Sequence, residues 1–275
     1  MNPRDTAGEI DFERRFGGLR RLHGNDAYHL IRQARVAVVG LGGVGSWAAE
    51  ALGRSGVAAL TLIDLDHVAE SNINRQVQAT DGTLGQSKAV ALCERIAAIH
   101  PGCRTIPVEA FVDEANWPQL LAEPVDVVID ACDQLRAKAV LAAWGRTTGT
   151  AVVTVGAAGG KRRPQAVEAA DLADVSHDPL LAALRQRLRQ RHGAARHGPI
   201  GVRCVFSREP VALPWRDPGT ESRIDAGLNC HGYGSAVMVT ATFGMVAAAE
   251  ALAALPDALA PRDATTRLLP QGDDR

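Results

Sequence analysis

Seven polar side chains between residues 64 and 88 have the types and spacing to bind a nucleoside triphosphate. They are Asp64, Asp66, Asn72, Asn74, Arg75, Gln76 and Lys88. The planar guanidinium of Arg75 can span triphosphate oxygens, Lys88 offers a second point charge, and Asp64 can accept hydrogen bonds from ribose hydroxyls. The asparagines can bind ribose, phosphate or metal-bound water. This set predicts ATP cleavage, because a dinucleotide oxidoreductase has no use for an Asn-x-Asn-Arg-Gln run.

An aspartate later in the chain could add a metal to this site. Asp130 follows the predominantly apolar run 125–129, so it is expected at the carboxyl end of a central strand, where a carboxylate can ligate Mg²⁺. With Arg75 and Lys88, it would stabilise charge on a pentacoordinate α-phosphorus and on departing pyrophosphate. Each residue alone also fits an ordinary role, Lys88 as a solvated helix residue and Asp130 as a turn former. Their coincidence favours catalysis.

A glycine turn supplies the scaffold that these side chains need. The turn contains Gly40, Gly42, Gly43 and Gly45, and it separates a predicted buried strand at 36–39 from a predicted helix at 46–54. A second strand at 61–63 ends at Asp64. Such a strand–turn–helix–strand unit brings backbone N–H groups to a phosphate chain. The glycines also satisfy the G-x-G-x-x-G pattern of NAD enzymes, so an NAD oxidoreductase stays an alternative.

Helical and strand patterns alternate along the rest of the chain. We predict one or two helices within 14–35, further helices at 85–100, 117–121, 137–147, 178–192 and 234–255, and strands at 105–110, 125–129, 151–155 and 202–206. This order is typical of an α/β fold with a doubly wound, mostly parallel, Rossmann-like sheet and a smaller C-terminal extension.

Length and composition limit the size of the domain and the cellular compartment in which the protein is expected. The chain has 275 residues, 46% of them hydrophobic, so one large α/β domain is possible. No apolar run approaches the roughly 20 residues needed to cross a bilayer, and the charged start of the chain is not a signal peptide. Five scattered cysteines without a C-x-x-C pair argue against a disulfide framework or a structural zinc. We therefore expect a cytoplasmic protein.

The polar and glycine motifs in combination resemble the ThiF/MoeB-type family, the bacterial relatives of ubiquitin-activating enzymes. The residues that carry the resemblance are Gly40-x-Gly42-Gly43-x-Gly45, Asp64-x-Asp66, Asn72-x-Asn74-Arg75-Gln76, Lys88 and Asp130-Ala131-x-Asp133. The resemblance implies ATP and Mg²⁺ as cofactors and transfer of AMP to a carboxylate with release of pyrophosphate. It implies that Asp64 holds the ribose, that Arg75 and Lys88 hold the phosphates, and that Asp130 holds the metal.

Within that family, residues 14–250 resemble the tRNA threonylcarbamoyladenosine dehydratase branch. The shared stretches are Arg15-Phe16-Gly17-Gly18, 42–52, Gly159-Gly160, Asp178-Pro179-Leu180, 204–207 and 238–244. The branch implies that ATP activates the threonyl carboxylate of a modified adenosine beside the tRNA anticodon. Attack by the carbamoyl group then closes a ring with net loss of water. The zinc-binding C-x-x-C pairs of the wider family are missing, as this branch permits.

The resemblance also implies a division of the chain and an assembly. We expect an ATP-binding adenylation core at 14–160, a C-terminal substrate-binding, tRNA-binding and dimerisation part of the same domain at 161–255, and a disordered tail at 256–275. The family forms homodimers in which an N-terminal arginine reaches the partner's ATP, and Arg15 and Arg21 are the candidates.

Basic residues in the C-terminal part could bind the tRNA. The densest group is Arg185, Arg187, Arg189, Arg191, Arg196 and Arg203, and a second group is Lys161, Arg162 and Arg163. A tRNA partner requires a surface that binds phosphates. A solvated, arginine-rich helix explains the main group about equally well.

Cys230 is a further catalytic candidate. It lies in a glycine-rich loop where thioester-forming relatives carry a nucleophile, and the adjacent His231 could lower its pKa. Because ring closure supplies its own nucleophile, a non-essential cysteine is the favoured interpretation.

Two other functions stay open besides the NAD enzyme. The protein could adenylate the C-terminal glycine of a ubiquitin-like sulfur carrier, or it could be a non-catalytic nucleotide sensor in a sulfur-transfer system. Either function would imply a cysteine desulfurase or a sulfur-acceptor protein as a partner.

Overall fold

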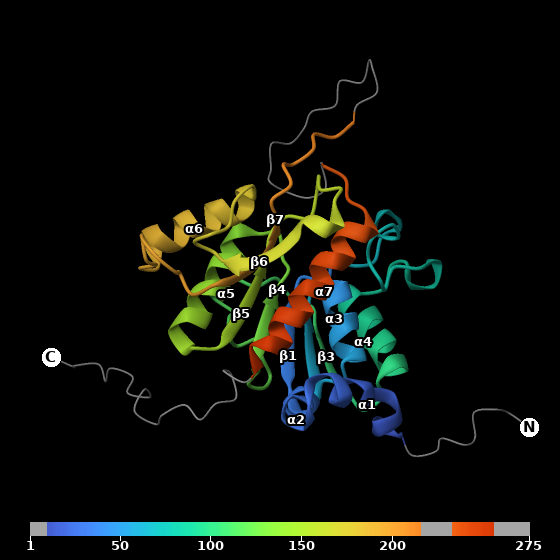
Figure 1. Cartoon of the computed structure of the whole chain (residues 1–275). Coiled ribbons are helices and arrows are strands. Elements are labelled where there is room, and N and C mark those ends of the chain that lie inside the picture. The colour runs from blue at the N-terminus through green and yellow to red at the C-terminus, as the bar shows by residue number, and fades with distance from the viewer. Residues whose placement is uncertain (1–9, 216–232, 256–275) are drawn as a thin grey trace, which may run out of the picture.

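A seven-stranded sheet forms the centre of the computed structural model, which describes residues 10–215 and 233–255 (Figure 1). The strands lie in the order β3-β2-β1-β4-β5-β7-β6. Their bounds are β1 Arg35–Val39, β2 Ala59–Ile63, β3 Arg104–Val108, β4 Val127–Asp130, β5 Ala151–Val155, β6 Val167–Asp171 and β7 Arg203–Ser207. Six strands are parallel, and the edge strand β6 runs antiparallel to β7. This is the predicted α/β, doubly wound and mostly parallel architecture.

The strand register aligns the loops that carry the polar residues. Val39, the last residue of β1, pairs with Ile63 at the end of β2 and with Asp130 at the end of β4. These three strands therefore end at the same edge of the sheet, and the loops that follow them start there. Because the chain leaves β1 toward β2 and leaves β4 toward β5, a crevice opens between the loops after β1 and β4.

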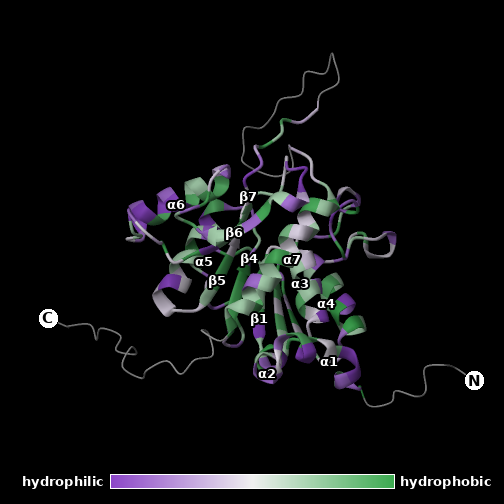
Figure 2. Cartoon of the chain, viewed as in Figure 1, coloured by the Kyte–Doolittle hydropathy of each residue, from purple (hydrophilic) through white to green (hydrophobic). Residues whose placement is uncertain are grey.

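Helices cover both faces of the sheet (Figure 1). Their bounds are α1 Phe12–His23, α2 Asn25–Gln33, α3 Gly45–Arg54, α4 Lys88–Ile99, α5 Leu135–Thr148, α6 Pro179–Arg191 and α7 Val237–Ala253, with short 3₁₀ helices at Glu70–Asn72, Asp81–Thr83 and Pro164–Ala166. Helices α3, α4 and α7 cover one face, and α5 and α6 cover the other. Figure 2 shows hydrophobic residues along the central strands and hydrophilic ones on α1 and on parts of α6.

The alternation of side chains in β1 explains why both faces are apolar. Val36 and Val38 pack with α3 and α4, whereas Ala37 and Val39 pack with Val128 and with α5. A strand buried on both sides has no polar alternation, and this is why a run of four apolar residues predicts it.

Two expectations for the secondary structure need correction, at 117–121 and at β6, and the open number of helices within 14–35 is settled as two. The predicted helix at 117–121 is wrong, because this segment forms turns, in which the Leu120 N–H donates to the Asn116 carbonyl and the Leu121 N–H to the Pro118 carbonyl. The segment 14–35 forms two helices because Gly24, with φ 83°, ends the first one. Strand β6 was not predicted, since its residues are small and partly exposed at the sheet edge.

Candidate functional site

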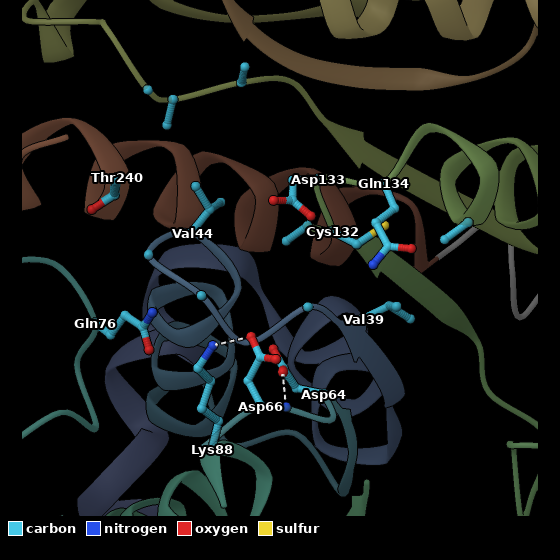
Figure 3. Close-up of a pocket in the computed structure, with 18 of the residues that line it drawn as sticks. Val39, Val44, Asp64, Asp66, Gln76, Lys88, Cys132, Asp133, Gln134 and Thr240 are labelled. Carbon is cyan, nitrogen blue, oxygen red and sulfur yellow. Dashed lines mark hydrogen bonds and ion pairs between the residues drawn. The ribbon is translucent and has the colours of Figure 1, made fainter. Parts of the chain in front are cut away.

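The largest concentration of predicted site residues lines a pocket at the carboxyl edge of the sheet (Figure 3). The loops that follow β1, β2, β3, β4 and β5 all contribute to its wall, and the first turns of α4, α6 and α7 complete it. A doubly wound sheet binds ligands at this edge, so the fold places the polar residues where a nucleotide would lie.

The glycine turn lets the backbone pass close to β4 on its way into α3. Gly40 adopts a φ of 85°, and a Cβ added there would lie 2.7 Å from the backbone nitrogen of Cys132. A Cβ added to Gly45 would lie 1.8 Å from the carbonyl oxygen of Gly40. Gly40, Gly42 and Gly43 line the pocket, whereas Gly45 begins α3. The N-terminus of α3 and the glycine backbone thus meet the pocket, as a phosphate site requires.

The carboxylates after β2 and the lysine of α4 form one connected group. Asp64 accepts hydrogen bonds from the N–H of Leu41 at 2.6 Å and of Asp66 at 2.9 Å, which fixes its orientation. Burial raises the pKa of the Asp64 carboxyl, and the positive charge of Lys88 partly offsets this effect. The Lys88 ammonium pairs with the Asp66 carboxylate at 2.8 Å (Figure 3). All three side chains line the pocket, as predicted.

The Asn-x-Asn-Arg-Gln run divides into residues that line the pocket and one that supports them. Asn72, Arg75 and Gln76 line it. Asn74 lies behind Arg75, because its Oδ1 accepts from the guanidinium at 2.9 Å and its amide donates to the Ser235 carbonyl at 3.0 Å. Asn74 therefore orients Arg75 and joins it to the segment before α7.

Asp130 does not line the pocket. Its side chain is fully buried and pairs with the equally buried Lys138 at 3.1 Å. Burial is the strongest single influence and opposes the charged form of Lys138, but Asp130, Cys132 and Asp178 together outweigh it, so the pKa of Lys138 is raised. Asp133, three residues farther along the same loop, does line the pocket, on the side opposite Lys88 (Figure 3). The structure thus places Asp133 where the sequence analysis expected Asp130.

The arginines of the C-terminal part separate into three places. Arg185 and Arg189 line a groove with Arg196 and His197, and this groove has no carboxylate in its lining. On another side of α6, Arg187 and Arg191 line a hollow beside Asp113 and Glu114. Arg203 lies on β7 and pairs with Glu250 of α7 at 2.7 Å. Arg185 and Arg189 thus lie on one side of α6 and Arg187 and Arg191 on another, whereas Arg203 joins neither pair.

The second basic group and Cys230 are the remaining candidates of the sequence analysis. Lys161 is buried, and its ammonium donates to the carbonyls of His177 at 3.1 Å, Ser207 at 3.3 Å and Glu209, so it is not part of a basic surface. Arg162 and Arg163 are exposed. Cys230 lies outside the described residues, as do 216–232 and the predicted tail at 256–275.

Sequence reasoning missed pocket residues that carry no charge pattern of their own. Phe111, Ser235 and Thr240 line the pocket from the loop after β3 and from the start of α7. No local signal marks them, because they reach the site only through the tertiary fold. Asp133 is different, since it stands within the Asp130-Ala131-x-Asp133 motif, which holds two carboxylates after one strand.

Comparisons with known proteins agree with this geometry. The ThiF family matches residues 14–270. The tRNA threonylcarbamoyladenosine dehydratase of Escherichia coli is 44% identical over 250 residues, which cover 88% of this chain and 93% of that protein. Its crystal structure in complex with ATP superposes with a TM-score of 0.81 at 42% identity and covers 90% of this chain and 96% of that chain. The molybdopterin-synthase adenylyltransferase of the same organism is 38% identical, but over only 40% of this chain and 44% of that protein.

Fold and comparisons define a Rossmann-like protein of the ubiquitin-activating-enzyme type, with a pocket at the carboxyl edge of its sheet. The chain belongs to the ThiF family. Within it, the similarity runs through nearly the whole length of tRNA threonylcarbamoyladenosine dehydratases.

Proposed function

We propose that this protein is an ATP-dependent dehydratase that adenylates the threonyl carboxylate of tRNA threonylcarbamoyladenosine and cyclises it. The pocket carries the proposal, because Arg75, Lys88 and the glycine turn converge on one crevice in a chain that resembles such dehydratases over 88% of its length. ATP is the proposed cosubstrate, and the E. coli relative has been crystallised with it.

The side chains of the pocket suit both halves of the reaction. In the first half, the carboxylate attacks the α-phosphorus of ATP, and pyrophosphate leaves with negative charge that Arg75 and Lys88 can stabilise. In the second half, the carbamoyl group attacks the acyl carbon, AMP leaves, and one proton is released. The two halves together remove one water from the nucleoside. Asp64 would hold the ribose through hydrogen bonds.

Mg²⁺ fits the pocket as a companion of ATP. Among the described residues, no three His, Cys, Asp or Glu side chains come together as a protein-only metal site. Mg²⁺ is usually held by one or two carboxylates together with substrate phosphates and water, and Asp133 supplies a carboxylate at the pocket wall. Mg²⁺ would neutralise phosphate charge. We assign its protein ligand to Asp133, because Asp130 is buried against Lys138.

Asp133→Asn is expected to weaken the binding of ATP in the presence of Mg²⁺ by about tenfold or more, because it removes a ligand charge. The affinity for AMP without metal should change little. Isothermal titration calorimetry of both nucleotides measures the two effects. Equal losses for AMP and ATP·Mg²⁺ would contradict the metal assignment.

One experiment separates the proposed reaction from its main alternative. The protein is incubated with ATP, Mg²⁺ and either threonylcarbamoylated tRNA or a sulfur-carrier protein that ends in Gly-Gly. We expect the modified nucleoside to lose the mass of one water and the carrier to stay unmodified. An acyl-adenylate on the carrier alone would favour the carrier function. The partial match to the molybdopterin-synthase adenylyltransferase makes that function the second candidate.

We place the tRNA backbone in the groove lined by Arg185, Arg189, Arg196 and His197. Charge supports this choice, since the groove lining contains no carboxylate, whereas the hollow on the other side of α6 includes Asp113 and Glu114. The Arg185 guanidinium is held by the carbonyls of Leu172 and Val175 at 3.0 and 2.8 Å. Arginines fixed in this way lose less entropy when they bind a phosphate.

Replacing both Arg189 and Arg196 with alanine should weaken tRNA binding in a salt-dependent way. For each phosphate that the double variant no longer neutralises, the slope of log affinity against log salt is expected to fall by about one. The affinity for ATP should stay the same, because neither residue lines the nucleotide pocket. Arg104→Ala is the matched control, since Arg104 lies on β3 and pairs with Glu123. An unchanged salt slope in the double variant would contradict the placement.

The assembly and the setting of the protein also stay proposals. We propose a homodimer and a cytoplasmic location, with a cysteine desulfurase or sulfur-acceptor protein as a further partner.

The outward side of α7 supports the homodimer, because the side chains of Met238 and Met245 there are 62% and 42% exposed. Of the arginines considered for the partner's site, Arg15 is held by the Ile99 carbonyl at 2.8 Å, and Arg21 is exposed. No helix in the described part of the chain is long and apolar enough to cross a membrane.

A further inference from the structure

A buried ion pair lies behind the wall of the nucleotide pocket. The Asp130 carboxylate and the Lys138 ammonium are both fully inaccessible to solvent and lie 3.1 Å apart. Removing two charges from water is costly, and buried pairs can often be replaced by apolar residues without loss of stability. Stability alone is therefore a weak explanation for this pair, and its position in the fold suggests another.

The pair closes a loop at both ends. Asp130 is the last residue of β4, and Lys138 lies in the first turns of α5. Between them, Ala131, Cys132, Asp133 and Gln134 all line the pocket. One ion pair thus joins the point where the chain leaves the sheet to the helix that it enters next.

The Asp130 carboxylate also fixes the first residues of the loop directly. Its Oδ1 accepts from the Cys132 thiol at 2.9 Å and from the Cys132 backbone N–H at 3.3 Å, in addition to Lys138. The Lys138 ammonium donates to the Asp130 carbonyl at 3.3 Å. The Ala131 N–H continues the β1 ladder, with the Val39 carbonyl at 2.8 Å. Cys132, the residue before Asp133, is therefore held by a carboxylate that is itself paired with Lys138, and neither Asp130 nor Lys138 belongs to the pocket lining.

We infer that Asp130 and Lys138 are positioning residues that clamp the Ala131–Gln134 loop and thereby hold Asp133 toward ATP·Mg²⁺. The identity of the ligand, ATP·Mg²⁺, rests on the proposed function. The clamp itself rests on the contacts of Asp130 and Lys138 in the structure. Apolar residues at these two positions could fill the interior but could not hold the loop in this way. Groups that orient a metal ligand change the affinity for the metal without contacting it.

The clamp can be removed without leaving a lone buried charge. Lys138→Met alone would strand the Asp130 carboxylate in the interior and could prevent folding, so the test uses the double variant D130V/K138M. We expect this variant to fold, to exchange the amide hydrogens of 131–134 faster, and to bind ATP·Mg²⁺ about tenfold more weakly. Its affinity for AMP without metal should stay within about twofold. Calorimetry and hydrogen exchange measured by mass spectrometry provide the readouts.

A matched control is available at the opposite end of the same strand. Asp126 precedes β4, accepts the Arg35 N–H at 2.8 Å and pairs with the Arg35 guanidinium at 3.3 Å. The double variant D126V/R35M likewise removes a pair between an aspartate and a cation at β4, here one with a partly exposed arginine, far from the pocket. It should leave exchange in 131–134 and the ratio of the two nucleotide affinities unchanged.

The outcomes distinguish the clamp from the proposed function. Unchanged exchange in 131–134, or equal losses of AMP and ATP·Mg²⁺ affinity in D130V/K138M, would overturn the clamp. Failure of the unaltered protein to bind ATP·Mg²⁺ would overturn the proposed function instead, and the exchange measurement would still decide whether the pair fixes the loop.

Discussion

Arg75→Ala is expected to lower the rate of acyl-adenylate formation by about a thousandfold. An arginine that stabilises the transition state of phosphoryl transfer contributes on the order of 10³ or more to the rate, and Arg75 lines the pocket with its side chain oriented by Asn74. Pyrophosphate release in the presence of ATP, Mg²⁺ and the tRNA substrate measures this rate.

The loss should appear in kcat more than in nucleotide affinity. Loss of an interaction that forms only in the transition state lowers kcat and kcat/KM equally, so the affinity for AMP should change much less than the rate. Arg75→Lys keeps the charge but not the planar fork, and we expect it to recover only part of the activity. Arg104→Ala, at an exposed ion pair on β3, should retain full activity. If Arg75→Ala turns over normally, Arg75 has no part in the chemistry.

The polar residues after β1 and β2 could be predicted because their signals are local. A glycine turn between a strand and a helix has few structural alternatives, and Asp64 follows its strand directly. The carboxylates at the end of β4 were harder to assign, since two aspartates stand there, one as the last residue of the strand and one three residues later. Asp130 lies two residues after Val128, which packs with α5 in the core. Side chains alternate along a strand, so Asp130 points to the same face as Val128, toward α5 and Lys138. This alternation could have excluded Asp130 from the pocket and indicated Asp133 instead.

Other features depended on tertiary contacts that no local pattern carries. Lys161 belongs to a basic run in the sequence, but the fold turns it inward against three carbonyls. Arg203 follows the arginine-rich helix α6 in the chain, yet β7 carries it to Glu250 of α7. Charge clustering in a sequence therefore overestimates a basic surface wherever the chain reverses direction between the charges.

Gly45→Ala should be among the most damaging single changes in the protein. A Cβ at this position would lie 1.8 Å from the carbonyl oxygen of Gly40 and 3.2 Å from the Ala131 side chain. A backbone oxygen cannot move aside as a flexible side chain can, so the turn between β1 and α3 must shift. We expect a loss of about 3 kcal/mol in the free energy of unfolding and no measurable ATP binding. Denaturant titration and calorimetry measure the two quantities.

Gly42→Ala provides a matched comparison within the same turn, because the two glycines serve different needs. A Cβ on Gly42 would meet no protein atom within 4 Å, and its φ lies outside the left-handed region. The free energy of unfolding should therefore change by less than about 1 kcal/mol. Gly42 lines the pocket, however, and its methyl group would occupy space that the phosphates need to approach the backbone. ATP affinity should fall in a stable protein. A destabilised Gly42→Ala that binds ATP normally would show that the turn, and not the ligand, requires this glycine.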